Sequence, residues 1–583
     1  MAPPLLQLNG ERAVVLLYVI RILSSSSLSL IPQAFSLSVL SLFALCVEIF
    51  ADHASNPLAH YFQTRPGASS GILLGAVTLP SLMFSRLIQI LRAVTLHEVG
   101  IEELEHLKLQ FWAVSAICFT VLFFLCIIGR HQTKNIDFFS SKINLNAKHS
   151  FMVVASLGFC FSSLFGGWHV SLMLLCVLCH GLTAVKLLQK MLRTFPACVS
   201  IGESLLVTSG LVIYFGDMLT CTAAKVFLVQ NGIKRSEIST IIQGMIFGLL
   251  LLPVFYKYVI QMWECCASFW SNGAQENHDI QRSFVFYVLL TSVLVVVAPS
   301  WMQFVHDFQM HPLLWALHFV FSEPLKRLTL CVYWLVIISV AVRQFYYISK
   351  NSKTERILLR KYYHLLAVSI FVPALVFQAK FLDLAFGAAL AVFLVLEIIR
   401  IWKIWPLGQQ VHKFMNAFTD HRDSDLIIIS HFSLLLGCAI PIWLSSDFSD
   451  RPLAPFAGIL SLGIGDTMAS MVGHKYGVLR WSKSGSTFFT LSLIFPSFNQ
   501  YVPFTEMLLL FLEKTIEGTA AGITSVLAAC FVLLPLLAAT GYIFTMHWFS
   551  LIVAVTISGL LEAYTAQLDN AFIPLVFYSL LCL

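Results

Sequence analysis

Residues 463–477 read GIGDTMASMVGHKYG and concentrate polar chemistry within a very apolar chain. The stretch holds four glycines, an aspartate, a histidine and a lysine. Gly463 and Gly465 allow another backbone or a ligand to approach closely. One carboxylate among glycines, at the polar edge of an apolar segment, suits a divalent cation or a metal-bound phosphate. Asp466 is therefore a candidate metal ligand, and an aspartate that caps a helix is the structural alternative.

Basic residues follow this stretch in a loop that is rich in turn-forming residues. Lys475, Arg480 and Lys483 lie within it. Cations just beyond a metal-binding carboxylate would suit a polyphosphate. Basic residues also gather in cytosolic loops of membrane proteins for topological reasons alone. Both interpretations stay open on the sequence.

A second polar stretch, EKTIEGTAAG at residues 513–522, begins the next long apolar segment. Thr515 or Thr519 could cap a helix there, and Glu517 and Gly518 would lie in its first turn. A helix N-terminus beside Lys514 attracts anions. The stretch does not match the phosphate-binding G-x-x-x-x-G-K-[ST] loop, so it predicts an anion site of another type.

The third stretch, LLEAYTAQLDNAF at residues 560–572, contains Glu562, Asp569 and Asn570 between apolar runs. Glu562 and Asp569 are seven residues apart, which places them on one face of a helix. Polar groups at membrane depth need partners and are candidates for function. A helix corner satisfied by water is the structural alternative.

Two further stretches, RKYYH at 360–364 and LEIIR at 396–400, add ionisable groups near apolar segments. Glu397 precedes Arg400 by three residues, so an ion pair within one helix is the simplest interpretation. His364 at the start of a span is expected to be an interfacial residue rather than a base.

The elements that must position these groups are membrane-spanning helices. The chain has 583 residues, of which 58% are hydrophobic and 11% are charged, whereas a soluble domain carries roughly 25% charged residues. Its mean hydropathy is +0.83. The apolar runs are continuous rather than alternating, which excludes a membrane β-barrel. We expect an all-α polytopic transmembrane protein with roughly 15–17 spans. The predicted spans are 13–30, 35–51, 70–92, 110–129, 151–167, 169–187, 199–217, 240–258, 283–301, 328–347, 363–379, 383–402, 426–445, 455–472, 520–541, 545–562 and 571–583.

The distribution of charge predicts two regions and a topology. Residues 1–349 form a multi-span membrane region with few intramembrane charges, and residues 350–583 form the membrane catalytic region. Residues 350–364 are strongly basic, so this loop faces the cytosol. Counting spans from there returns residues 473–485 to the cytosolic side. The net charge of +6 is spread over many loops, and no Lys/Arg run resembles a nucleic-acid-binding patch.

The type of chemistry follows from the residues that are present and absent. The chain has no G-x-S-x-G, no H-E-x-x-H and no intact dinucleotide-binding glycine motif, so it offers no candidate nucleophile. Carboxylates and cations remain at the cytosolic membrane face. Phosphoryl transfer needs positioning and charge neutralisation more than covalent catalysis. The residues therefore fit phosphoryl transfer to a lipid.

Taken together, GIGDTMASMVGHKYG, KTIEGTAAG and LLEAYTAQLDNAFIPL resemble the dolichol kinases, of the CTP-dependent polyprenol kinase family. The resemblance covers about residues 350–583, including RKYYH and LEIIR, and is weaker in the N-terminal half. It implies that CTP phosphorylates dolichol, or another polyprenol, at the cytosolic face of the endoplasmic reticulum membrane. A divalent cation, Mg or Ca, would take part. The product, dolichyl phosphate, would carry sugars for protein glycosylation.

The resemblance also implies roles for individual residues. Asp466 would be the leading metal carboxylate, with Asp569 as a second ligand. Lys483 and Lys514 would bind phosphates, and Glu517 or Glu562 would be the base for the alcohol. The residues expected to bind the nucleotide are Gly477, Arg480, Trp481, Lys483, Lys514, Thr515, Gly518 and Thr519.

Two other functions stay open on the sequence. One is another CTP-dependent lipid enzyme, such as a phytol kinase, a diacylglycerol kinase or a lipid cytidylyltransferase. The other is a membrane transporter in which the charges line a pathway. A transporter would be favoured by weak internal symmetry between the halves of the chain, and we find none in the sequence.

Residues 486–513 form an atypical apolar insert between Lys483 and Lys514. In the family a short turn joins the corresponding motifs. If residues 488–512 crossed the membrane, Lys514 would emerge on the lumenal side, away from Lys483. Pro496 and Pro503 interrupt the apolar run, which favours a re-entrant or interfacial hairpin. A retained intron or a splice variant is the alternative.

Overall fold

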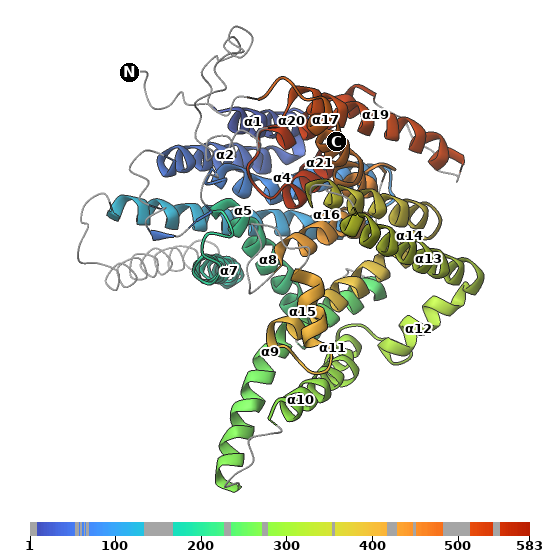
Figure 1. The fold of residues 1–583 in the computed structure, drawn as a ribbon. Coiled ribbons are helices and arrows are strands. Elements are labelled where there is room, and N and C mark those ends of the chain that lie inside the picture. Colours follow the sequence, from blue (N-terminus) through green and yellow to red (C-terminus); the bar gives the residue numbers. More distant parts are fainter. Residues whose placement is uncertain are drawn as a thin grey trace. The chain divides into compact units, whose positions relative to one another are not determined.

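The computed structural model describes most of the chain. It covers residues 9–52, 58, 61–62, 64–65, 69–132, 167–226, 235–270, 278–351, 356–416, 428–446, 450–481, 514–539 and 548–583. Helices account for nearly all regular structure in these ranges, and an isolated antiparallel bridge joins Arg480 to Thr515. Figure 1 shows the helices coloured along the chain.

Local sequence signals set several helix starts. The Asn9 side chain accepts a hydrogen bond from the Arg12 amide at 2.9 Å, so it caps the first helix, α1 (Gly10–Leu23). Proline begins both α12 (Pro312–Ser322) and α13 (Pro324–Asn351), where its missing amide proton is not needed. Long apolar runs then continue the helices.

The chain divides into two compact units. Unit 1 contains residues 1–216, 355–368 and 448–583, and unit 2 contains residues 217–354 and 369–447. Unit 1 joins the N-terminal region to the C-terminal stretches, and the predicted division of the chain at residue 350 stays a prediction. The placement of the catalytic chemistry in residues 350–583 stays a prediction.

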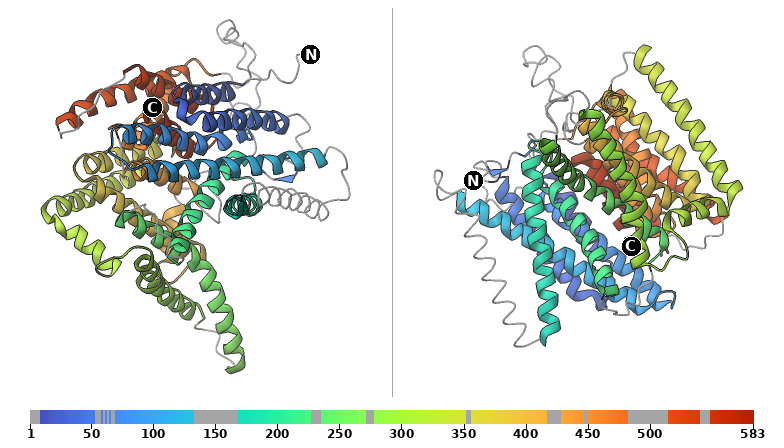
Figure 2. Two further views of the ribbon diagram at one scale, coloured as in Figure 1. Left: turned by 180° about the vertical axis from the view of Figure 1, so that it is seen from behind. Right: turned by 90° about the horizontal axis from the view of Figure 1, so that it is seen from below.

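Unit 1 packs helices from both ends of the chain against one another. The central helix α4 (Ile72–Thr95) contacts α1, α2 (Ile31–Ala51), α5 (Ile101–Gln132) and α21 (Asp569–Leu581). The helix α20 (Trp548–Tyr564) contacts α1, α21 and α19 (Ile516–Ala539). Figures 1 and 2 show these C-terminal helices, in red, beside the N-terminal helices, in blue. The remaining elements of unit 1 are η2 (Leu28–Leu30), α7 (Gly167–Thr194), most of α8 (Ile201–Val226), the start of α14 (Arg356–Trp402), η4 (Ala454–Phe456), η5 (Ile459–Asp466) and α17 (Thr467–Tyr476).

Unit 2 has its own core. Tyr256 stacks on Trp402 with ring centroids 4.6 Å apart, and Phe286 packs edge-on against both rings. The predicted ion pair is confirmed: Arg400 donates to both oxygens of Glu397 at 2.9 and 2.8 Å, and both residues are buried. Its elements are the end of α8, α9 (Glu237–Trp270), α10 (His278–Ser292), η3 (Val293–Val297), α11 (Ala298–Val305), α12, α13, most of α14, α15 (Gly408–Asn416) and α16 (Ile429–Ser445).

The fold class is confirmed as all-α and membrane-spanning. Nine helices among the described residues are long and apolar enough to cross a membrane, and four shorter helices are also apolar. Large apolar side chains cover the outside of some helices, such as Leu325 and Leu335 on α13, which are 82% and 67% exposed. Lipid is the solvent that suits such a surface. The number of 15–17 spans stays a prediction, and the predicted span 151–167 lies almost wholly outside the described residues.

Small residues allow α17 and the end of η5 to pack closely against α19. Gly465, Ala469 and Gly473 recur every fourth residue, and they face Gly518 and Gly522 of α19. A Cβ atom on Gly518 would lie only 2.5 Å from the carbonyl oxygen of Ala469. This small-residue spacing is typical of close helix pairs in membranes. The glycines of the 463–477 stretch thus serve helix contact as well as any ligand.

Replacing Gly518 by valine is therefore expected to destabilise unit 1. The added atoms would push α19 away from α17, and overpacking of this kind costs about 1–3 kcal/mol. Thermal unfolding of the detergent-purified protein should show a lower midpoint. Gly100→Ala is the matched control, because a Cβ there meets nothing within 4 Å. Equal midpoints for both variants would contradict the packing argument.

Candidate active site

Asp466 lies at the end of η5, buried at 2% exposure. Lys361 donates to its two carboxylate oxygens at 2.7 and 2.6 Å. The Nδ1 atom of His364 lies 3.2 Å from Oδ2 of the same carboxylate. Both partners come from the start of α14, and Lys361 is 105 residues away in the sequence. A carboxylate between two nitrogen groups at this depth is an electrostatic centre rather than a simple helix cap.

Sequence reasoning did not include Lys361 among the site residues. The available signal was its spacing of three residues from His364, which places both side chains on one helical face. The expectation that His364 is an interfacial residue was wrong, because it is only 6% exposed and faces Asp466. Contact between α14 and η5 decides this arrangement.

The backbone around Asp466 is adapted to that contact. The segment η5 is a π-helix of eight residues, a wider turn that occurs often at functional sites. Gly463 lies within it, and a Cβ atom there would be 2.3 Å from the Val368 side chain of α14. Glycine at this position thus lets α14 approach η5 closely enough for Lys361 to reach Asp466.

A second ion pair joins Lys514 to Glu562 of α20. The Lys514 ammonium donates to Oε1 and to the main-chain carbonyl of Glu562, both at 2.5 Å. The Glu562 side chain is 9% exposed, and that of Lys514 is 35% exposed. Burial lowers the pKa of Lys514, but the negative charges of Glu562, Asp569 and Asp466 outweigh this effect and raise the pKa overall. Lys514 therefore stays a cation at neutral pH, and it links three carboxylates electrostatically.

The expected nucleotide residues on either side of the insert meet. The Trp481 amide donates to the Lys514 carbonyl at 3.1 Å, and the Ile516 amide donates to the Leu479 carbonyl at 2.8 Å. Arg480 and Thr515 are paired across this antiparallel contact. A Cβ atom on Gly477 would be 2.5 Å from the Thr515 side chain, so that glycine permits the approach.

The side chains of this cluster have structural partners. Thr515 caps α19, because its Oγ1 accepts the Gly518 amide at 3.2 Å. Thr519 accepts the indole Nε1–H of Trp481 at 3.0 Å, and the Trp481 ring packs against Tyr564 with centroids 4.9 Å apart. These bonds hold residues 477–481, the nucleotide segment, against both α19 and α20.

The two candidate bases differ in their surroundings. Both carboxylate oxygens of Glu517 accept the Leu479 amide, at 3.0 and 3.2 Å, so this side chain fixes the nucleotide segment. Glu562 instead lines a cavity together with Asp466. The structure thus brings Asp466, Glu562 and Lys514 together, whereas Glu517 bonds to the backbone of Leu479. Lys483 lies outside the described residues.

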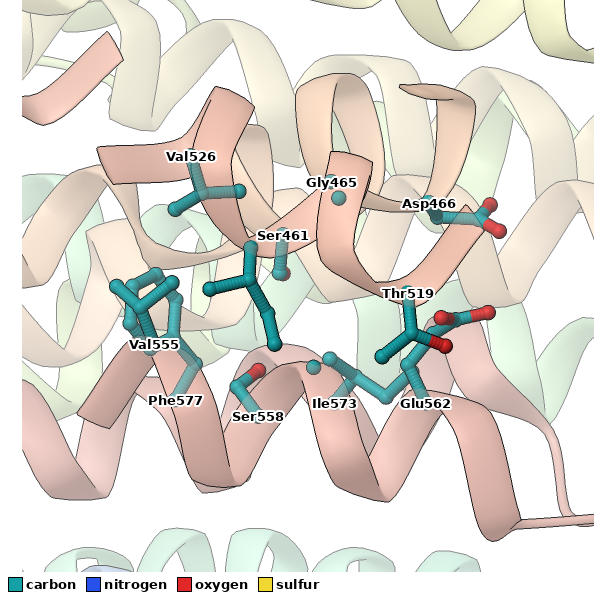
Figure 3. A pocket seen from close by; sticks show the side chains of 13 residues that line it. Ser461, Gly465, Asp466, Thr519, Val526, Val555, Ser558, Glu562, Ile573 and Phe577 are labelled. Atoms are coloured by element: carbon teal, nitrogen blue, oxygen red, sulfur yellow. The ribbon is translucent and has the colours of Figure 1, made fainter. Parts of the chain in front are cut away.

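The cavity lies between η5, α19, α20 and α21. Its volume is about 30 Å³, and it is partly open to solvent. Figure 3 shows its polar end at Asp466, Thr519 and Glu562 and its apolar end at Val555 and Phe577. The full lining is Ser461, Gly465, Asp466, Thr519, Gly522, Ile523, Val526, Val555, Ser558, Gly559, Glu562, Ile573 and Phe577. Such a cavity suits a molecule with an apolar body and a polar end.

The residues present fit a divalent cation that is bound jointly by protein carboxylates and by a phosphate. Asp466, Glu562 and Asp569 interact electrostatically with one lysine and supply the oxygen donors that Mg²⁺ and Ca²⁺ prefer. Across the described ranges no three His, Cys, Asp or Glu side chains are arranged to hold an ion by themselves. Mg²⁺ typically uses one or two carboxylates and completes its shell with phosphate and water.

The described residues on the two sides of the insert meet. Residues 482–513 lie outside the described residues, but their neighbours Trp481 and Lys514 share a backbone hydrogen bond. A segment with adjoining ends can be shortened without moving its flanks. Removal of residues 486–512 leaves five residues between Trp481 and Lys514, which is a common length for a tight antiparallel connection.

Deletion of residues 486–512 is therefore expected to preserve or raise the phosphate-transfer activity that the family resemblance implies. The contact between Trp481 and Lys514 would persist, so both flanking segments would keep their positions. The measurement is turnover of the purified deletion variant beside the full chain. Cysteine labelling at positions 484 and 514 should report one common, cytosolic side. Labelling of position 514 from the lumen alone, or loss of activity on deletion, would show that the insert crosses the membrane or is needed.

Comparison with known proteins identifies the family of the chain. The family model described as Dolichol kinase matches residues 170–479, more than half of the chain. The chain is 56% identical to Dolichol kinase EVAN of Arabidopsis thaliana, over 99% of this chain and 98% of that protein. It is 29% identical to Dolichol kinase of Homo sapiens, over 67% of this chain and 66% of that protein. No solved structure is similar to it. The similarity extends into the N-terminal half, beyond the three sequence motifs, and the chain belongs to the dolichol kinase family.

Proposed function

We propose that this protein transfers the terminal phosphate of CTP to dolichol, giving dolichyl phosphate for protein glycosylation. The observation that carries the proposal is the cavity, whose apolar end leads to Asp466 and Glu562. The polar end of the same cavity adjoins the nucleotide segment through Thr519 and Trp481. A lipid alcohol and a nucleotide could therefore meet at one place.

The lipid would enter with its hydroxyl group first. Val526, Val555 and Phe577 offer apolar contacts to the isoprene unit next to the hydroxyl. The hydroxyl would then lie at the polar end, beside Glu562. The remaining isoprene units would stay in the bilayer, which suits a chain with apolar helices on its outside.

The donor would be held by charge and by the start of α19. Lys514 precedes that helix, whose N-terminal amides and dipole favour anions. Arg480 is exposed beside Lys514 and Thr515, so a polyphosphate can reach it. Lys483 is proposed to complete this set of cations. Gly477, Gly518, Trp481 and Thr519 would shape the segment rather than contact phosphate.

The chemical step would use Glu562 as the base. The dolichol oxygen forms a bond to the terminal phosphorus of CTP, and the bond from that phosphorus to the bridging oxygen of the second phosphate breaks. The hydroxyl proton goes to Glu562, and CDP leaves. Lys514, which pairs with Glu562 here, would turn toward the phosphates and free the carboxylate to accept the proton.

Asp466 and Asp569 would hold a divalent cation, Mg or Ca, which when bound neutralises phosphate charge. Both oxygens of Asp466 accept Lys361, so this lysine would release at least one of them. Lys361 would then be free to contact the transferred phosphate. Its position explains how one carboxylate can stay charged and buried before the donor binds.

We further propose that the protein resides in the endoplasmic reticulum membrane with the site toward the cytosol. The helices long enough to span a membrane support a multi-pass protein. The segments at residues 350–364 and 473–485 are basic in sequence, and basic loops remain in the cytosol.

Purified protein in lipid, incubated with CTP labelled at the terminal phosphate, should transfer label to dolichol. Phytol, diacylglycerol and a parallel reaction with ATP separate the alternatives. We expect dolichol to be the best acceptor and CTP to be favoured over ATP at matched concentration. Equal rates with ATP would refute the donor, and preferred labelling of phytol or diacylglycerol would refute the acceptor.

A further inference from the structure

Residues 565–568 connect α20 to α21 and separate two of the site carboxylates. The expectation that Glu562 and Asp569 share one face of a helix was wrong, because Glu562 lies in the last turn of α20 and Asp569 is the first residue of α21. The position of this four-residue loop therefore sets the position of both carboxylates. Several of its hydrogen-bond partners come from residues 11–203, far in the sequence from every motif of the predicted site.

One partner is the start of α8. Glu203 accepts the Ser200 amide at 2.8 Å, and the Ser200 hydroxyl oxygen accepts the Glu203 amide at 3.1 Å. This reciprocal pair is a capping box, which satisfies free amides at a helix N-terminus. A capping box needs one carboxylate oxygen and one hydroxyl lone pair, so both side chains retain further bonding capacity.

That remaining capacity binds the loop. The second carboxylate oxygen of Glu203 accepts the Leu568 amide at 2.7 Å. The Ser200 hydroxyl donates to the side-chain carbonyl of Gln567. Arg65 donates to Glu203 at 2.9 Å and to the Ala566 carbonyl at 2.6 Å, so one guanidinium bridges α8 and the loop.

Two more contacts hold the loop. The Gln567 amide nitrogen donates to the Ser69 carbonyl at 3.0 Å, and the Thr565 hydroxyl donates to Glu11 at 2.9 Å. These contacts require the backbone at Gly202 to lie close to the backbone at Gly71. A Cβ atom on Gly202 would be 1.9 Å from the Gly71 carbonyl oxygen. Gly71 itself has a φ of +64°, a conformation that favours glycine.

These groups are buried and mutually satisfied. Ser200, Glu203 and Gln567 are each at most 2% exposed, and the Arg65 side chain is 9% exposed. Fully satisfied buried networks rigidify the segments that they join. We propose that Arg65, Ser200, Glu203 and Gln567 form a clamp that positions Glu562 and Asp569 for phosphate transfer. The clamp residues are positioning residues. The inference rests on the proposed function, which gives Glu562 and Asp569 their catalytic roles.

The clamp can be tested with Gln567→Ala and Arg65→Ala. We expect kcat to fall about 10- to 100-fold, because small displacements of reacting groups have effects of that size. The KM for CTP should change less than about twofold, since the nucleotide segment keeps its bonds to α19. Arg65→Lys should recover part of kcat by keeping a charged donor. Gln89→Ala is the matched control: this fully buried amide in unit 1 donates to Asp450 at 2.8 Å and does not contact the loop.

A second readout is independent of activity. Hydrogen exchange of a peptide covering residues 560–572 should become faster in Gln567→Ala and stay unchanged in Gln89→Ala. Ser200→Ala removes one hydroxyl and serves if a larger change prevents folding. Unchanged exchange and unchanged kcat in the clamp variants would overturn the inference, as would an equal loss in Gln89→Ala. Failure of the wild type to phosphorylate dolichol would refute the proposed function, while the exchange data would still decide whether the clamp holds the loop.

Discussion

Asp466→Asn is expected to abolish kinase activity, with a loss of at least about 100-fold in kcat. Asparagine keeps the shape of the side chain and one acceptor oxygen for Lys361, so membrane insertion should be unchanged. It removes the negative charge that Lys361 and His364 surround at 2.6 to 3.2 Å. That charge is the proposed ligand for the cation and the electrostatic centre of the site. Turnover with labelled CTP, across a range of cation concentrations, is the measurement.

Asp450→Asn is the matched control for this variant. Asp450 is also an aspartate of unit 1 that pairs with a cation, Arg92, at 3.0 Å, but it does not line the cavity. We expect it to retain turnover within a small factor. Near-normal turnover of Asp466→Asn at saturating cation would remove Asp466 from the reaction. A similar loss in both variants would mean that aspartate ion pairs in unit 1 affect activity by stabilising the fold.

Lys514→Met is expected to lower kcat/KM for CTP by about 10²- to 10³-fold. Methionine retains the length and apolar stem of lysine and removes the cation that bonds to Glu562 and interacts with Asp466 and Asp569. The variant should bind phosphate less tightly, and it should lose the ion pair that holds the Glu562 carboxylate. Because the pKa of Lys514 is raised, the wild type should show no loss of activity from its deprotonation near neutral pH.

A double-mutant cycle with Glu562→Gln separates the two roles of Lys514. If the pair acts as a unit, the double variant should lose little more than the more damaging single variant. Lys108→Met is the control, since Lys108 forms a surface ion pair with Glu105 at 2.8 Å within one helix. Additive losses would contradict coupling between Lys514 and Glu562. A wild-type rate for Lys514→Met would exclude this lysine from phosphate binding.

The sequence predicted the fold class because lipid imposes a simple rule on composition. Continuous apolar runs must become helices in a bilayer, where every backbone group needs an internal partner. The spacing of Glu397 and Arg400 also predicted their ion pair, because residues three apart share a helical face. Such signals are local, and local geometry is encoded in neighbouring residues.

Residues that meet across the fold gave weaker signals. Lys361 and Asp466 are 105 residues apart, and their contact depends on the π-helical turn of η5 and on Gly463 facing Val368. The choice between Glu517 and Glu562 as base was open on the sequence. The packing of α19 and α20 decides that Glu562 lines the cavity, and the assignment of the base stays a prediction.

By itself, the sequence determined a helical membrane protein and, by resemblance, the kinase family, and it predicted phosphate-transfer chemistry for three polar stretches. Only the tertiary structure decided that Lys361 and His364 surround Asp466 and that Arg65, Ser200 and Glu203 hold the loop beside Glu562 and Asp569. The physical reason is the range of the interactions. Helix formation and lipid burial depend on residues within a few turns. An ion pair or a capping box that reaches a distant loop depends on packing between helices, which glycines permit but sequence spacing does not specify.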